Sequence, residues 1–118
     1  MKKVLVIDDS DFQRNIIKGI VNTLQYDTDD TSNAQEAVSM VENGEYFCIL
    51  CDLLMPIMDG YGFLTELREK KIDVPVVILT ADRQNTTKEK CVELGAKDVI
   101  NKPTKAEVLK EIFSTIDK

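Results

Sequence analysis

Residues 49–60, with the sequence Ile-Leu-Cys-Asp-Leu-Leu-Met-Pro-Ile-Met-Asp-Gly, begin as an apolar run and end as a loop. The apolar part, which starts near Phe47, is typical of a buried β-strand. It brings a single carboxylate, Asp52, to the predicted strand end, and Pro56 and Gly60 then interrupt regular structure. One acid at a strand end is common, so its meaning depends on what the other predicted strands carry.

The length and composition predict one globular domain. The chain has 118 residues, of which 43% are hydrophobic and 31% charged. Its net charge of -6 disfavours nucleic-acid binding, which needs concentrated basic charge. No apolar run approaches the ~20 residues of a membrane span, and the apolar run near the N-terminus is too short for a signal peptide. We therefore expect a monomeric, cytoplasmic protein that binds neither nucleic acid nor membranes.

The cysteine and histidine content excludes several kinds of site. The three cysteines form an odd set, and Cys48 and Cys51 spell C-x-x-C within a predicted strand. At that spacing they lie ~10 Å apart on opposite faces of the strand, too far for a disulfide or a shared metal. The chain has no histidine, which excludes imidazole–zinc sites and Ser-His or Cys-His nucleophiles. We expect the cysteines to be structural.

Five predicted strands alternate with five predicted helices. The strands are 4–7, 26–31, 46–51, 76–80 and 98–101, and the short polar second one is typical of a sheet edge. The helices cover about 11–25, 34–43, 63–69, 85–94 and 105–116. Ser10 is the predicted N-cap of the first helix, with Gln13 three residues on, and Thr104 that of the last, with Glu107 at N3. Strict alternation predicts a doubly wound α/β fold, with a parallel sheet covered by helices on both faces.

Polar residues end four of these strands. They are Asp8 and Asp9, Asp52, Thr80 and, just after the last strand, Lys102. In a parallel sheet the carboxyl ends share one edge, where ligands bind at the topological switch point. Each residue alone has a structural explanation, such as a helix-dipole partner, a loop cap or a solvated lysine. Their convergence on one edge favours a site.

The chemistry of this set points to phosphoryl transfer. Three neighbouring carboxylates repel one another unless one holds a proton or a cation lies among them. All-oxygen ligands suit Mg²⁺ or Mn²⁺. Lys102 would add a positive charge and Thr80 a hydroxyl donor, which together suit the oxygens of a phosphoryl group. A carboxylate such as Asp52 can accept that group as a nucleophile.

The whole chain resembles a response-regulator receiver domain of two-component signalling. The residues that carry the resemblance are Asp8-Asp9, Asp52-x-x-Met55-Pro56-x-Met58-Asp59-Gly60, Thr80-Ala81, Gly95-Ala96 and Lys102-Pro103. The resemblance implies a flavodoxin-like five-stranded sheet of order 2-1-3-4-5. The resemblance covers the whole chain, so we expect a single receiver domain over residues 1–118, with no output domain.

The same resemblance implies roles for individual residues. Asp52 would be the phosphoacceptor. Mg²⁺ would be bound by Asp9, Asp52 and the backbone carbonyl of Leu54 directly, and by Asp8 mostly through water. The phosphoryl oxygens would be held by Thr80, the Ala81 amide and Lys102. The Lys102–Pro103 bond would be cis.

The resulting functional expectation is a stand-alone response regulator. A histidine kinase or a phosphotransfer protein, docking on the first helix near Phe12 and Ile16, would phosphorylate Asp52 and so switch the binding of a protein target, for example in chemotaxis. The alternatives are a phosphorelay intermediate or phosphate sink, a Mg²⁺-dependent phosphatase, and an unphosphorylated scaffold. The phosphatase is disfavoured because Leu54 stands where a D-x-D motif has its second acid. We thus expect no enzyme beyond phosphoryl transfer to, and hydrolysis from, its own Asp52.

One position, Val99, departs from the family pattern, and a second, Asp82, leaves the lifetime of the phosphoryl group undecided. Val99 occupies the place of an aromatic residue that swings inward in many members, and a β-branched side chain has few rotamers. Our hypothesis is that activation is instead read through the loops after the third and fourth strands. Asp82, beside the site, would either orient an attacking water or repel it, so the phosphoryl lifetime stays open.

Overall fold

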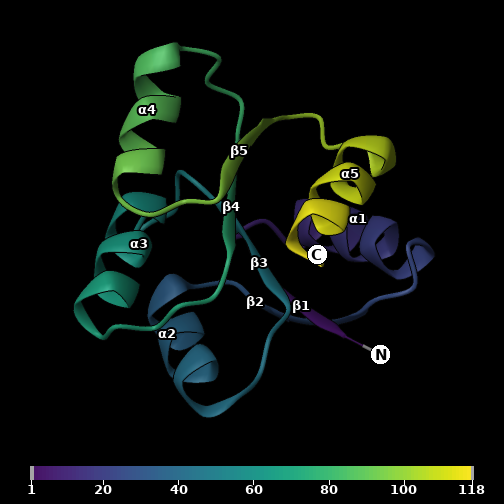
Figure 1. Cartoon of the computed structure of the whole chain (residues 1–118), viewed down its shortest axis with the longest axis horizontal. Helices are drawn as coiled ribbons and strands as arrows, with labels where there is room; N and C mark the ends of the chain where they lie inside the picture. Colours follow the sequence, from purple (N-terminus) through teal and green to yellow (C-terminus); the bar gives the residue numbers. More distant parts are fainter. Residues whose placement is uncertain (1, 118) are drawn as a thin grey trace.

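The computed structural model describes residues 2–117 and contains one five-stranded sheet (Figure 1). All its strand pairs are parallel, and the order is β2-β1-β3-β4-β5, as predicted. The strands are β1 (Lys3–Ile7), β2 (Asp27–Thr31), β3 (Cys48–Asp52), β4 (Val76–Thr80) and β5 (Asp98–Asn101). The polar β2 lies at an edge of the sheet, where it pairs with a strand on one side only.

Five helices cover the two faces of the sheet. They are α1 (Asp11–Thr23), α2 (Ala34–Asn43), α3 (Gly60–Glu69), α4 (Asn85–Glu93) and α5 (Ala106–Ile116). Helices α1 and α5 share one face, and α2, α3 and α4 the other (Figure 1). Successive strand residues feed opposite cores: Leu5 packs towards α2 and α3, and Val6 towards α1 and α5. Burial on both faces explains the continuous apolar runs.

Most helix ends follow their local sequence signals. The Ser10 hydroxyl accepts a hydrogen bond from the Gln13 amide at 3.3 Å, as predicted for the start of α1. The Thr104 cap was wrong, because α5 begins at Ala106 with Lys105 at its N-cap and no side-chain bond there. The difference is one residue, and the helix buries the same Leu109 and Phe113 from either start. A cap contributes only about 1 kcal/mol, so this local signal is weak.

The cysteines are structural, as expected. Cys48 and Cys51 are both fully buried but belong to cores on opposite faces of the sheet. Cys48, Cys51 and Cys91 are all free thiols. Burial raises the pKa of Cys48 to about 12, so the reactive thiolate is scarce at neutral pH. Within residues 2–117, no helix combines the length and apolarity that a membrane crossing requires.

Candidate functional site

Three carboxylates meet where β1 and β3 end. These strands are neighbours in the sheet, with Ile7 opposite Cys51. Asp8 and Asp9 follow the last residue of β1, and Asp52 is the last residue of β3. One oxygen from each carboxylate lies within 4.8 Å of the others. The sheet therefore assembles the acidic cluster that the strand ends predicted.

Asp8 is the most deeply buried member of this cluster, with 1% of its surface exposed. Its Oδ1 accepts a hydrogen bond from the Ser10 amide at 2.9 Å, whereas its buried Oδ2 has no hydrogen-bond partner among residues 2–117. Burial raises the pKa of Asp8; the Ser10 amide opposes that rise, and the charge of Asp52 adds to it. A buried acceptor without a donor, facing other carboxylates, suits a cation.

Lys102 supplies one positive charge to the cluster from the loop after β5. Its Nζ lies 2.9 Å from Asp52 Oδ1 and 3.8 Å from Asp8 Oδ2. One ammonium therefore faces three carboxylates, which leaves a negative excess. That excess and the all-oxygen donor set fit a divalent cation such as Mg²⁺ or Mn²⁺, with Asp8, Asp9 and Asp52 as its side-chain ligands.

Leu54 lies in the loop just beyond β3. Its side chain is 70% exposed. A leucine side chain has no ligand atom, so Leu54 could bind a cation only through its backbone carbonyl, and that role stays a prediction.

Thr80 ends β4 beside the cluster and is 2% exposed. Its neighbours tie it in place, because the Leu53 amide bonds the Leu79 carbonyl at 3.0 Å and the Lys102 amide bonds the Thr80 carbonyl at 2.8 Å. The Thr80 hydroxyl accepts a hydrogen bond from the Asp82 amide at 3.1 Å. Its own proton remains free to be donated. Ala81 follows directly, so its backbone amide lies at the same strand end.

Asp82 has a role that the sequence did not reveal. One carboxylate oxygen accepts from the Gln84 amide at 2.9 Å, and the other from the Thr87 hydroxyl at 2.6 Å. The Thr87 bond, followed by the Gln84 bond, lowers the pKa of Asp82. Asp82 thus joins the loop after β4 to the first turn of α4. An aspartate just after a strand is itself a signal for such an Asx turn, because its side chain can accept from the backbone amide two residues on.

Arg14 is a second residue that sequence reasoning missed. It lies on α1, and its guanidinium donates to the Asp8 carbonyl at 2.7 Å and to Asp30 Oδ2 at 2.7 Å. A single sequence has no signal for this contact, because Asp30 belongs to another element.

Comparisons with known proteins agree with this geometry. Residues 4–114 match the family model of the response regulator receiver domain. The transcriptional regulatory protein SrrA of Staphylococcus aureus is 38% identical over 101 residues, which are 86% of this chain and 42% of that protein. The chain thus spans about two-fifths of the length of the curated relatives it matches.

Solved structures show the same fold. The receiver domain of Francisella response regulator 1452 superposes with a TM-score of 0.92 at 29% identity, over 98% of this chain and 96% of that one. The receiver domain of the sensor histidine kinase PA1611 of Pseudomonas aeruginosa, which has a magnesium ion coordinated in its active site cleft, has a TM-score of 0.89 at 28% identity. That match covers 99% of this chain and 98% of that one. With the sequence match over residues 4–114, these likenesses show that the chain belongs to the response regulator receiver domain family of two-component signalling.

Proposed function

We propose that Asp52 accepts a phosphoryl group in a Mg²⁺-dependent reaction and that the aspartyl phosphate switches the binding of a protein target. Receiver domains act in phosphorylation-based signalling, bind Mg²⁺ in their active site, and interact with histidine kinases or phosphotransfer proteins. The observation that carries the proposal for this chain is the surrounding of Asp52. Its carboxylate lies beside two further acids, one with an unpartnered buried oxygen, and 2.9 Å from the Lys102 ammonium.

The proposed transfer forms one bond and breaks one. A carboxylate oxygen of Asp52 attacks phosphorus, and the bond from phosphorus to the donor's imidazole nitrogen or acyl oxygen breaks, with its electron pair leaving on the donor. A bound Mg²⁺ would offset the charge of the phosphoryl oxygens. Lys102 pairs with the Asp52 carboxylate before the transfer, and its ammonium can pair with the phosphoryl oxygens after it. The free Thr80 proton and the Ala81 amide are the remaining donors.

The switch is proposed to act through the loop after β4. When Thr80 donates to a phosphoryl oxygen, its hydroxyl reorients, and the bond from the Asp82 amide changes with it. Asp82 is tied to α4 through Thr87, and its carbonyl accepts from Asn101 Nδ2 on β5 at 2.8 Å. A rearrangement at Thr80 therefore reaches α4 and β5 without the aromatic side chain that Val99 replaces.

Val99→Tyr tests this route. Val99 is partly buried against the core under α4, and we expect that restoring an aromatic there leaves the phosphorylation-induced amide shifts of α4 and β5 unchanged. The measurement is an NMR comparison of wild type and variant, with and without phosphodonor, and Val99→Ile is the control that enlarges the side chain but keeps it aliphatic and β-branched. A large increase in the shifts on β5 or α5 for Val99→Tyr alone would count against the route through Asp82.

Other parts of the functional expectation remain predictions. They are the stand-alone arrangement, the cytoplasmic location, a role in chemotaxis and the absence of turnover on external substrates. A relay intermediate or phosphate sink would use the same chemistry at Asp52, with the phosphoryl group passed on instead of being read. The exposed Phe12 and Ile16 on α1 suit the docking of the phosphodonor protein.

The experiment that tests the proposal is an intact-mass measurement. The protein is incubated with a small acyl phosphodonor and Mg²⁺, and in parallel with a chelator. We expect one phosphoryl adduct per chain with Mg²⁺, restored by Mn²⁺, and none with the chelator. Donor hydrolysis without any adduct would instead support the phosphatase, and no reaction with any donor would support the scaffold.

A further inference from the structure

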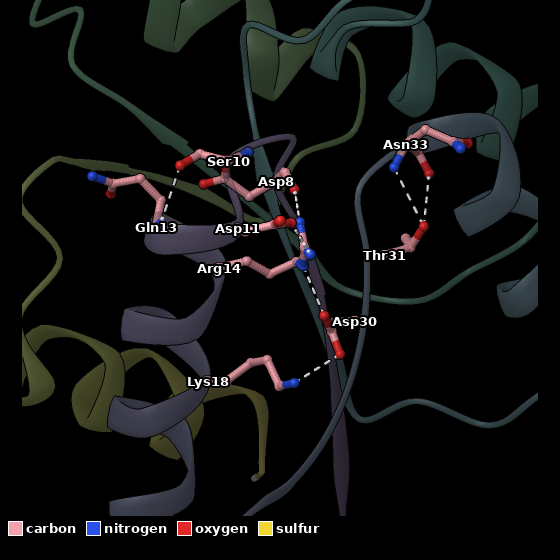
Figure 2. Close-up of polar contacts among 9 residues, drawn as sticks. All are labelled: Asp8, Ser10, Asp11, Gln13, Arg14, Lys18, Asp30, Thr31 and Asn33. Atoms are coloured by element: carbon pink, nitrogen blue, oxygen red, sulfur yellow. Dashed lines mark hydrogen bonds and ion pairs between the residues drawn. The ribbon is translucent and has the colours of Figure 1, made fainter.

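The guanidinium of Arg14 joins three segments of the chain beside the acidic cluster (Figure 2). Nη1 donates to the Asp8 carbonyl at 2.7 Å, Nε to Asp30 Oδ2 at 2.7 Å, and Nη2 to Asp11 Oδ1 at 2.5 Å. The side chain is 13% exposed. Arg14 therefore connects the end of β1, the start of α1 and the end of β2.

The contact with the Asp8 carbonyl bears on the metal ligands because of peptide geometry. A peptide unit is planar, so the Asp8 carbonyl and the Asp9 amide share one rigid plane. The Asp8 amide is itself held by the Thr31 carbonyl at 3.2 Å. With both backbone groups of Asp8 bonded, the direction in which its side chain leaves the backbone is fixed. The Asp9 side chain follows from the same fixed peptide plane, with the φ rotation of Asp9 as its remaining freedom.

Asp30 holds the guanidinium in the orientation that reaches Asp8. Its two oxygens are both engaged, Oδ2 by Arg14 Nε and Oδ1 by Lys18 Nζ at 2.8 Å (Figure 2). The bond from Lys18, and then that from Arg14, lowers the pKa of Asp30, so the carboxylate stays charged at neutral pH. The register that places Thr31 opposite Ile7 brings this carboxylate beside the end of β1.

The charges within this group balance. Arg14 and Lys18 are positive, and Asp11 and Asp30 are negative, so the four side chains together add no net charge beside the acidic cluster. The effect of Arg14 on the site is thus one of position rather than charge.

We propose that Arg14 is a positioning residue for the divalent cation, which fixes the Asp8–Asp9 peptide through the Asp8 carbonyl and so preorganises both carboxylates. This inference rests on the proposed function to the extent that the site binds Mg²⁺. Outer groups that orient metal ligands typically change metal affinity by 10–100-fold when removed. The planar guanidinium of Arg14 donates to the Asp8 carbonyl and to Asp30 at the same time. A lysine ammonium lacks this geometry.

Arg14→Met tests the inference, with Mg²⁺ affinity measured by calorimetric titration and folding by thermal unfolding without metal. We expect Arg14→Met to bind Mg²⁺ about tenfold more weakly than wild type while remaining folded, and Arg14→Lys to bind it nearly as weakly. The amide of Asp8 should exchange with solvent faster in both variants. The matched control is Arg68→Met, which makes the same substitution at an exposed arginine on α3, outside this group, and should leave the affinity within twofold.

Each outcome decides the question. A folded Arg14→Met protein with the Mg²⁺ affinity of wild type would overturn the inference, even if its unfolding midpoint falls, because the role would then be structural only. Should Arg14→Met not fold, Arg14→Lys decides by the same comparison. A wild-type protein that binds no Mg²⁺ would contradict the proposed function instead, and that result is distinguishable because it appears before any variant is made.

Discussion

Asp52→Asn is expected to abolish the phosphoryl adduct, from about one per chain to none detectable. A carboxamide is a far weaker nucleophile than a carboxylate, so the attack on phosphorus fails even when Mg²⁺ and the donor are present. The fold should persist, because Asn has nearly the same shape and Lys102 still has Asp8 Oδ2 at 3.8 Å. Intact mass and thermal unfolding of the same sample check both statements.

Asp59→Asn is the matched control for this prediction. Asp59 is a nearby acid whose side chain accepts from the Gly62 amide at 2.9 Å and caps α3. Asn caps helices about as well as Asp, so this variant should fold and carry the adduct. An adduct that survives in Asp52→Asn, or disappears in Asp59→Asn, would place the phosphoryl group elsewhere.

Asp8→Asn is expected to have opposite effects on stability and on metal binding. Without metal, the folded protein keeps a buried carboxylate close to Asp52 and Asp9, with one oxygen unpartnered. The amide removes that charge and still accepts from the Ser10 amide. We expect the free energy of unfolding at neutral pH to rise by about 1 kcal/mol, and the Mg²⁺ affinity to fall about 10–100-fold.

The pH dependence of this effect has a defined sign. Burial raises the pKa of Asp8 in the folded state above its usual 3.8, so folding favours the protonated acid. Burying the ionised Asp8 carboxylate costs folding free energy. This cost is absent below the pKa of Asp8 in the unfolded state and grows as the pH rises through its pKa in the folded state. The stabilisation by Asp8→Asn should therefore be largest at neutral pH and vanish in acid.

Urea unfolding in the presence of a chelator measures the stability change, and calorimetric titration measures the affinity. Asp73→Asn serves as the control, because it makes the same substitution at an exposed carboxylate before β4, at the opposite edge of the sheet, and should change neither quantity much. An Asp8→Asn protein that is less stable than wild type under chelator would contradict the account of Asp8 as a buried charge that Lys102 and the Ser10 amide only partly compensate.

The fold and much of the site were predictable from local features of the sequence. Continuous apolar runs such as 4–7 and 76–79, separated by amphipathic helices, require burial on both faces and hence a parallel sheet. Because parallel strands share one carboxyl edge, the positions of Asp8, Asp52 and Thr80 at strand ends were enough to bring them together. The start of α5 was missed by one residue, because the Thr104–Glu107 spacing is a weak local signal and the helix buries the same side chains from either start.

The sequence by itself therefore determined which carboxylate stands at the centre of the site, Asp52, and which strand ends surround it. Only the tertiary structure decided which side chains orient that site. Arg14 reaches Asp30 across 16 residues, and Asn101 reaches the Asp82 carbonyl across 19. Such contacts depend on strand register and on side-chain rotamers, which are fixed only in the folded chain. A polar residue with several possible partners carries no local signal of which one it binds.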